Sequence, residues 1–474
     1  MSAMALAELD ASLDQRLRDI VTSSGAPGAA IAIVAGGNRY AATFGVRRAD
    51  STLPIGAHTL FDVGSCSKSF VATAVALLVD AGKLDLDEPV QRWLPEMQLD
   101  DAASTAQLCA RDLLSNRIGF KRQIPIESFA NPELPVEEVL ARVRYLDRAH
   151  PFRRGYVYFN PGFMAARLLV ERVSGVDYGA FLDQHLFEPQ RMPHSTSGLR
   201  RVRQFDDRCN GHAMLATGAA PLPDNAFDNW QGAAGVHLCA DDATRWLDFL
   251  LATKSVAQLQ KPQMEMPRAE CKLIHAPPEA ERVDYCLGWW TTMLHARRLV
   301  QHAGEMFGWR AHTALLPDDG IGVCVMLNAP VPRHHAIAYT VLETLIANRA
   351  RDWCGIADRI AADFNERTTR AIASAFGVGS EVPLPTPRYA GRYRHPACGI
   401  VEIVATGEAE LEMRFLDGRI WDLQLRSIGG HVFETRPKKS AVHDYFPVPL
   451  RARFEVHDGK AIALVDPQAR YDAL

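Results

Sequence analysis

Residues 65–84 read SCSKSFVATAVALLVDAGKL, and this stretch decides how the rest of the chain is interpreted. The run is rich in Ala and Leu and has no Pro or Gly before Gly82, so it predicts a largely buried helix that ends at that glycine. Ser65 opens the helix and Lys68 follows three residues later. Because side chains three residues apart share one face of a helix, Lys68 is expected to touch Ser65.

The pairing of a serine with a lysine suits nucleophilic catalysis. A serine hydroxyl is a weak nucleophile until a base takes its proton, and a lysine held in an apolar site can lose its charge and act as that base. The N-terminus of the helix adds a positive dipole where negative charge develops. Taken alone, Ser65 and Lys68 fit a helix cap followed by a surface lysine better, so further motifs are needed.

Tyr158 and Asn160 form a second motif, in a loop just before a helix predicted over residues 161–175. A phenol beside an ammonium group can relay protons, so Tyr158 is a candidate second base. The amide of Asn160 can bind a substrate carbonyl or hold Lys68 in place. The alternative is a packing aromatic residue followed by a helix-capping asparagine.

A third motif closes the strand predicted over residues 297–304, which ends in His302-Ala303-Gly304 and is followed by Glu305. Glycine on an edge strand lets a substrate approach the backbone closely. A single histidine at a strand end is usually structural. The three motifs nevertheless occur together on a helix, a loop and a strand, and this agreement is hard to attribute to chance.

The remaining pattern predicts an α+β fold. Residues 28–46 read as two apolar strands joined by a Gly-Gly-Asn turn, and residues 103–190 are mostly helical in pattern. Further strands are predicted over residues 235–240, 297–304, 310–317 and 320–328. We therefore expect an antiparallel sheet flanked by helices, with an all-helical region, followed by a small C-terminal all-β barrel.

Three parts of the chain are distinguished by composition. Residues 1–350 carry all three motifs and are predicted to form the hydrolase domain. Residues 351–387 pass from a helical segment into the Pro-rich linker VPLPTPR. Residues 388–474 alternate polar and apolar positions, which predicts a β-barrel. Its turns are expected at Asp417-Gly418, Gly429-Gly430 and Asp458-Gly459.

Composition excludes several classes of function. The net charge of -4 gives no basic surface for nucleic acid and no polybasic stretch for a membrane. The N-terminal residues lack the pattern of a secretory signal, and no apolar run is long enough to span a bilayer. The nine cysteines are scattered, which favours a reducing cytoplasm over disulfides or zinc. We expect a cytoplasmic protein that binds no nucleic acid and no membrane.

With these motifs in place, the chain resembles the serine β-lactamase and penicillin-binding-protein superfamily. The resemblance is to the branch of class C β-lactamases, D-stereospecific aminopeptidases and related esterases. It covers about residues 28–345. Matching stretches include GAPGAAIAIV, TLFDVGSCSKSF, AGKLDLDEPVQRWLP, RDLLSNRIG, YVYFNPGF and the strand ending His-Ala-Gly. The segment beginning YAGRY resembles the lipocalin-like barrel that is appended to some of these hydrolases.

The resemblance implies a role for each motif residue. Ser65 would be the acylated nucleophile, Lys68 and Tyr158 would share the general acid and base work, and Asn160 would orient the substrate and the lysine. The backbone N–H groups of Ser65 and Glu305 would form the oxyanion hole.

In the same resemblance, Gly304 is the motif glycine and His302 would line the other side of the cleft. No metal and no organic cofactor are implied.

The sequence departs from its β-lactam-processing relatives in the third motif. They usually carry Lys-Thr-Gly, whereas Ala303 has no hydroxyl and His302 is largely neutral at pH 7. Recognition of a penicillin carboxylate is therefore disfavoured. Glu305 lies beside the expected oxyanion position, and we hypothesise that it favours a neutral or amine-bearing substrate. Residues 116–119, Asn-Arg-Ile-Gly, replace the His-Thr-Ser-Gly that is frequent in relatives.

The leading hypothesis is a serine hydrolase that cleaves an amide, peptide or ester bond of a small molecule or short peptide through an acyl-Ser65 intermediate. β-Lactamase and acyltransferase activity are alternatives on the same acyl-enzyme. An alternative of another class is a non-catalytic binding or sensor protein on this fold. The barrel would cap the catalytic domain or mediate homo-oligomers.

Overall fold

Eight antiparallel strands form the central sheet, in the order β2-β1-β13-β12-β11-β10-β9-β8. The computed structural model describes residues 6–121, 134–224, 228–378, 381–416, 422–438, 450–467 and 469–474. The strands of the sheet are β1 Gly28–Ala35, β2 Asn38–Gly45, β8 Met264–Glu265, β9 Asp284–Tyr285, β10 Trp290–Leu294, β11 Arg297–Met306, β12 Trp309–Leu316 and β13 Ile321–Leu327. The N-terminal hairpin thus pairs with β13, a strand that lies near the end of the first 350 residues.

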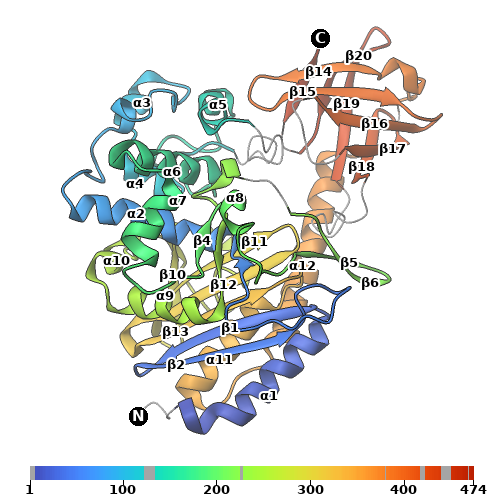
Figure 1. Cartoon of the computed structure of the whole chain (residues 1–474). Coiled ribbons are helices and arrows are strands. Elements are labelled where there is room, and N and C mark those ends of the chain that lie inside the picture. Colours follow the sequence, from blue (N-terminus) through green and yellow to red (C-terminus); the bar gives the residue numbers. More distant parts are fainter. Residues whose placement is uncertain are drawn as a thin grey trace.

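Helices cover both faces of this sheet (Figure 1). Every residue of β1 is buried, as is every residue of β13, so both strands read as continuous apolar runs. One face packs against α1 Leu6–Ser24, α11 His334–Ala347 and the start of α12 Trp353–Ala375. The other face packs against α9 Ala240–Ala252, beside α2 Ser67–Asp80 and α10 Lys254–Leu259.

Within the described residues 102–121 and 134–187, the predicted helical region is confirmed. Its helices are α3 Ala102–Gln107, α4 Ala110–Leu114, α5 Val136–Arg142, α6 Asn160–Ser174 and α7 Tyr178–Leu182. Helix α2 ends at Asp80, two residues before Gly82, whose φ of +67° suits glycine, and α6 ends at Ser174, directly before left-handed Gly175. Both ends agree with the sequence expectation.

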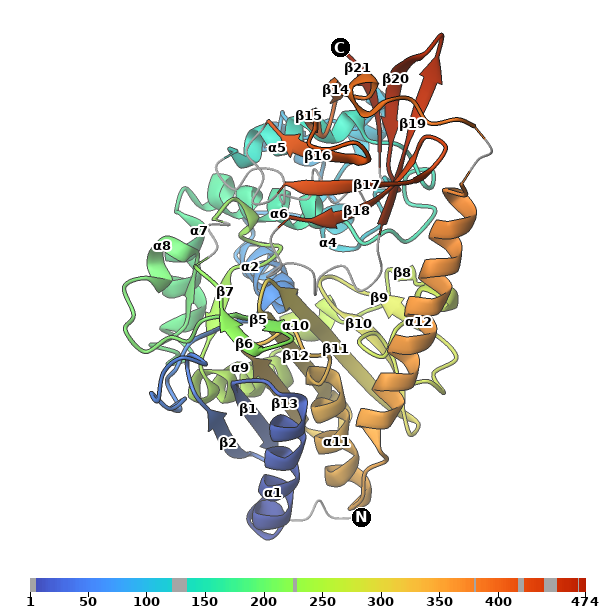
Figure 2. The ribbon, with the colours of Figure 1, turned by 90° about the vertical axis from the view of Figure 1, so that its right-hand side faces the viewer.

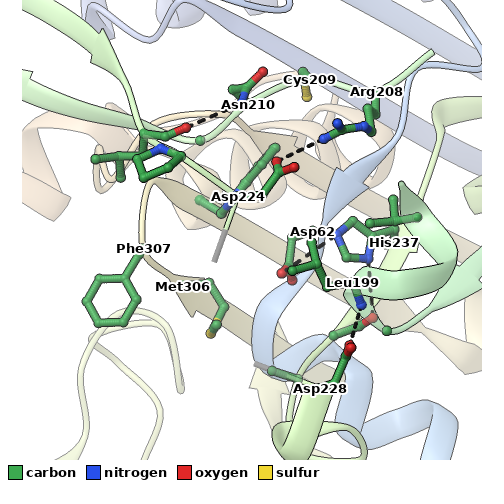
Figure 3. Close-up of a pocket in the computed structure, with 18 residues that line it drawn as sticks. Asp62, Leu199, Arg208, Cys209, Asn210, Asp224, Asp228, His237, Met306 and Phe307 are labelled. Atoms are coloured by element: carbon green, nitrogen blue, oxygen red, sulfur yellow. Dashed lines mark hydrogen bonds and ion pairs between the residues drawn. The ribbon is translucent and has the colours of Figure 1, made fainter. Parts of the chain in front are cut away.

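The segment 235–240 forms a strand, but not in the large sheet. Strand β7 Val236–Leu238 pairs with β3 Phe61–Asp62 and β4 Thr196–Ser197 in a separate three-stranded sheet. Hydrogen bonding to β3 draws this segment toward the residues just before Ser65. The small sheet borders a pocket in which Asp62 and His237 face each other (Figure 3). Beyond it lie helix α8 Leu199–Val202 and the hairpin of β5 His212–Leu215 and β6 Gly218–Pro221.

The C-terminal part is a closed barrel of eight antiparallel strands, and the α+β fold class with a C-terminal barrel is confirmed. The strands are β14 Gly391–His395, β15 Gly399–Ala405, β16 Glu410–Phe415, β17 Leu423–Gly429, β18 Val432–Pro437, β19 Leu450–His457, β20 Lys460–Val465 and β21 Arg470–Ala473. Turns lie at Gly429-Gly430 and Asp458-Gly459 as predicted, and Asp417-Gly418 lies outside the described residues. Aromatic side chains such as Tyr389 and Phe454 are buried in the barrel.

Helix α12 connects the two parts and runs alongside the first until the chain enters the barrel (Figure 2). Its first residue, Trp353, is buried and stacks on Tyr339 of α11 with ring centroids 4.6 Å apart. Just after the helix, the Phe376 carbonyl accepts a hydrogen bond from Arg451 of β19. The divisions after residues 350 and 387 stay predictions. Within the described residues, no helix has the length and apolarity needed to cross a bilayer.

Acid should destabilise the protein through three buried histidines between α11 and the sheet. His312, His334 and His335 are buried, and burial lowers the pKa of each, that of His335 to about 4. Below about pH 6.5 the unfolded chain therefore binds more protons than the folded chain. The free energy of unfolding is thus greatest above that pH and falls as the pH is lowered. The expected slope is about 1.4 kcal/mol per pH unit for each such group.

Thermal unfolding between pH 8 and 5 measures this effect. His334→Leu removes one such group, and its melting temperature should fall less steeply on acidification than that of the wild type. Equal slopes for the two proteins would contradict the assignment.

Candidate active site

Ser65 and Lys68 lie where the chain passes from the three-stranded sheet into helix α2. A 3₁₀ turn, Gly64–Cys66, follows β3 and leads directly into α2. Lys68 Nζ donates a hydrogen bond to Ser65 Oγ at 3.0 Å and another to the Ala233 carbonyl at 2.9 Å. The spacing of three residues therefore produces the expected contact.

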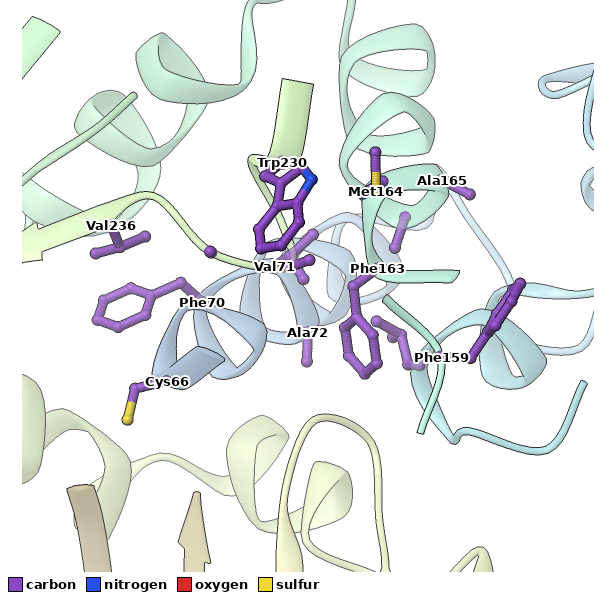
Figure 4. Packing of buried hydrophobic residues seen from close by; sticks show 14 of the residues in the cluster. Cys66, Phe70, Val71, Ala72, Phe159, Phe163, Met164, Ala165, Trp230 and Val236 are labelled. Carbon is purple, nitrogen blue, oxygen red and sulfur yellow. The ribbon is translucent and has the colours of Figure 1, made fainter. Parts of the chain in front are cut away.

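Lys68 is fully buried although it carries an amine. Its Nζ lies 4.8 Å from the ring centroid of Tyr158 and 5.2 Å from that of Phe163. Apolar side chains of α2, α6 and the loop before β7 pack around this end of the helix (Figure 4). Desolvation disfavours the charged form of an amine, which is the condition under which a lysine accepts a proton.

Asn116 holds the loop that carries Tyr158. The Asn116 side-chain oxygen accepts a hydrogen bond from the Phe159 N–H at 2.9 Å, and its carbonyl accepts one from the Val157 N–H at 3.0 Å. Asn116 is buried and adopts a φ of +57°, a conformation that asparagine tolerates better than most residues. These two bonds flank Tyr158, and Asn160 follows at the start of α6, also buried.

Strand β11 crosses the turn before α2 at very close range. A Cβ added to Gly304 would lie 1.9 Å from the Val63 carbonyl and 3.1 Å from the Ser65 nitrogen. A Cβ added to Gly64, whose φ is +51°, would lie 2.9 Å from the Glu305 nitrogen. Because both positions are glycine, the two backbone segments that carry the Ser65 and Glu305 amides can lie in contact. Two such N–H groups are the usual donors of an oxyanion hole.

His302 is fully buried and its ring stacks on Trp290 with centroids 4.1 Å apart. Its Nδ1 lies 2.7 Å from the Ala303 carbonyl and its Nε2 lies 3.3 Å from the Tyr285 hydroxyl. Burial, followed by the charge of Lys68, lowers the pKa of His302 well below its ordinary value. The imidazole is therefore neutral, and its ring centroid is 6.3 Å from that of Tyr158.

Glu305 points to the surface and is half exposed, with Arg310 opposite it on β12. The Arg310 Nε lies 3.4 Å from the Glu305 carboxylate, and the arginine side chain is largely buried. The Arg310 guanidinium therefore compensates much of the negative charge of the Glu305 carboxylate. The effect of Glu305 on substrate charge stays a prediction.

Three contributors to the site were missed by sequence reasoning. They are Asn116, the Ala233 carbonyl and the Ser67 hydroxyl, which accepts a hydrogen bond from the Val236 N–H at 3.0 Å. The Gly-rich run at 232–235 was the available signal for the Ala233 loop. Within the described residues, no three His, Cys, Asp or Glu side chains are grouped in a way that would hold a metal ion.

The fold and this arrangement define the class of protein: the chain belongs to the Beta-lactamase family, whose model matches residues 13–346. Among curated proteins it is similar to Unguisins hydrolase ungD of Aspergillus violaceofuscus. The two are 24% identical over 448 residues, which cover 84% of this chain and 76% of the relative.

Solved structures share the fold at lower identity. The octameric penicillin-binding protein homologue from Pyrococcus abyssi is 19% identical, with a TM-score of 0.62 over 97% of this chain and 99% of that one. The D-amino acid amidase from Ochrobactrum anthropi SV3 is 20% identical, with a TM-score of 0.57 over 71% of this chain and 99% of that one. Homo-oligomer formation by this chain stays a prediction.

Gly304→Ala should disrupt the site without any change of polar groups. The added methyl group meets backbone on the other segment and cannot be accommodated by a side-chain rotation, so β11 must move. We expect a loss of stability of about 1–3 kcal/mol in urea unfolding and a large loss of turnover. Gly377→Ala is the matched control, because its Cβ would meet nothing closer than 3.6 Å. Wild-type turnover in Gly304→Ala would contradict the close approach.

Proposed function

We propose that this protein is a serine hydrolase that cleaves an amide or peptide bond through an acyl-Ser65 intermediate. The observation that carries the proposal is the 3.0 Å hydrogen bond between a fully buried Lys68 amine and the Ser65 hydroxyl. A buried lysine is costly to retain unless it has a function or a full set of partners.

Acylation begins when Lys68 takes the hydroxyl proton and Ser65 Oγ attacks the substrate carbonyl carbon. The N–H groups of Ser65 and Glu305 stabilise the negative charge that develops on the carbonyl oxygen. Lys68 and Tyr158 pass the proton to the leaving nitrogen, the C–N bond breaks, and the acyl group stays on Ser65. Water then attacks the ester carbon and gives up a proton to the same pair, the bond between that carbon and Ser65 Oγ breaks, and the pair returns the proton to Oγ as the acid leaves.

The third motif favours an amidase or peptidase over a β-lactamase. His302 is buried and neutral, and Ala303 offers no hydroxyl, so this strand lacks an anchor for a substrate carboxylate. The name of one similar protein, a D-amino acid amidase, supports amide-bond substrates. We therefore propose substrates with a D-residue on the acyl side of the bond.

The nucleophile is tested by labelling. A fluorophosphonate should add one adduct to the wild type, detected by intact mass and mapped to Ser65, whereas Ser65→Ala should give none. Lys68→Met and Tyr158→Phe should lower the labelling rate and the turnover of a nitrophenyl ester at least 100-fold, the effect of losing an acid or base. Thr73→Val, on the same helix, should label like the wild type. Full turnover in Ser65→Ala would contradict the mechanism.

Stereochemistry is tested with paired aminoacyl nitroanilides. Hydrolysis of D-aminoacyl compounds should exceed that of their L-enantiomers at least tenfold in kcat/KM, and a chromogenic cephalosporin should be a poorer substrate than either. Faster hydrolysis of the cephalosporin than of every nitroanilide would instead favour the β-lactamase alternative.

A further inference from the structure

A small pocket of about 50 Å³, partly open to solvent (Figure 3), adjoins the candidate active site. Three residues of its lining lie on segments of the chain that also carry residues of that site. Asp62 precedes Ser65 by three residues, Ala234 follows the carbonyl that binds Lys68, and Met306 follows Glu305. Three residues span at most about 11 Å, so the pocket opens close to the reacting atoms.

The pocket is separate from the side of the site where a leaving group would be protonated. The leaving group must be near Tyr158, which helps to protonate it, and neither Tyr158, Asn160 nor His302 lines this pocket. Most of its walls come from residues 198–237, and the rest from Asp62 and from residues 306–309. The acyl side of a substrate, which points away from the leaving group, is therefore the part that this pocket can receive.

Carboxylates dominate the polar lining. Two of the three already have partners: Asp224 binds Arg208 at 2.8 Å, and Asp228 accepts the Leu199 N–H at 2.5 Å. The rest of the lining is largely apolar and would suit a hydrocarbon chain. The apolar side chains are Leu199, Val202, Leu222, Pro223, Met306, Phe307 and Trp309.

Among the described residues, neither Asp62 nor Asp228 has an arginine or lysine partner, and Asp62 is the nearer of the two to Ser65 in the chain. One Asp62 oxygen accepts the Gly64 N–H at 2.7 Å, and the other lies 3.9 Å from His237 Nε2, within ion-pair distance but beyond hydrogen-bond length. Burial raises the pKa of Asp62, and His237 opposes that rise only in part. A cation would be stabilised beside this carboxylate.

We propose that this pocket selects substrates that carry an alkylammonium group on the acyl-side residue, with the Asp62 carboxylate binding the ammonium and the apolar wall binding its hydrocarbon chain. This inference rests on the proposed function, since it assigns the specificity of the same acyl-enzyme. The ammonium is the end of a side chain such as that of ornithine.

The test compares kcat/KM for D-ornithyl and D-norleucyl nitroanilides, which match in chain length and differ in charge. The wild type should prefer D-ornithyl, and the preference should persist when both compounds carry an Nα-acetyl group. Equal hydrolysis of the two acetylated compounds would overturn the inference.

Asp62→Asn keeps an oxygen for the Gly64 N–H and removes the charge, so it should lower the preference at least tenfold and leave the neutral acetylated substrate within about threefold of wild type. Asp363→Asn, an exposed carboxylate on α12, is the matched control and should change nothing. An unchanged preference in Asp62→Asn would overturn the inference, as would loss of the preference in Glu305→Gln alone.

Inhibition of the wild type supplies a second measurement that does not depend on a folded variant. n-Butylammonium should compete with a neutral nitrophenyl ester, and 1-butanol at the same concentration should not. Equal inhibition by the two would overturn the inference. Failure of the proposed function is distinct, because it would appear as the absence of any Ser65 adduct.

Discussion

The arrangement of the site depends on a lysine that the fold keeps out of water. Lys68 donates to the Ser65 hydroxyl and to the Ala233 carbonyl, and the rings of Tyr158 and Phe163 lie beside its amine. Burying an amine is costly unless partners or chemistry compensate for the lost hydration. These contacts are maintained by the packing of the buried helix α2, the loop before β7 and the start of α6. The same packing therefore forms both the core and the site.

A second constraint is the crossing of two backbones. β11 passes the turn before α2 so closely that neither Gly304 nor Gly64 tolerates a side chain. The rigid eight-stranded sheet fixes one segment, and the small sheet of β3, β4 and β7 fixes the other. The amides of Ser65 and Glu305 are thereby held in place, as the proposed oxyanion hole requires.

Charge near the candidate site is largely absent or compensated. His302 is neutral because it is buried next to Lys68, and Arg310 compensates Glu305. The carboxylate of Asp62 lies beside an apolar wall, with His237 Nε2 3.9 Å from one of its oxygens. Its hydrogen bond to the Gly64 N–H ties this carboxylate to the turn that presents Ser65, so substrate selection and nucleophile placement share one residue.

The sequence by itself determined what depends on local spacing. It predicted the Ser65 to Lys68 contact, the ends of α2 and α6, the antiparallel sheet and the barrel, because helical periodicity and glycine conformations act over a few residues. Only the tertiary structure decided what depends on distant partners. It placed residues 236–238 in a separate sheet, brought Asn116 to the Tyr158 loop and aimed the Ala233 carbonyl at Lys68. Such contacts join residues more than 40 positions apart, and no short-range pattern encodes them.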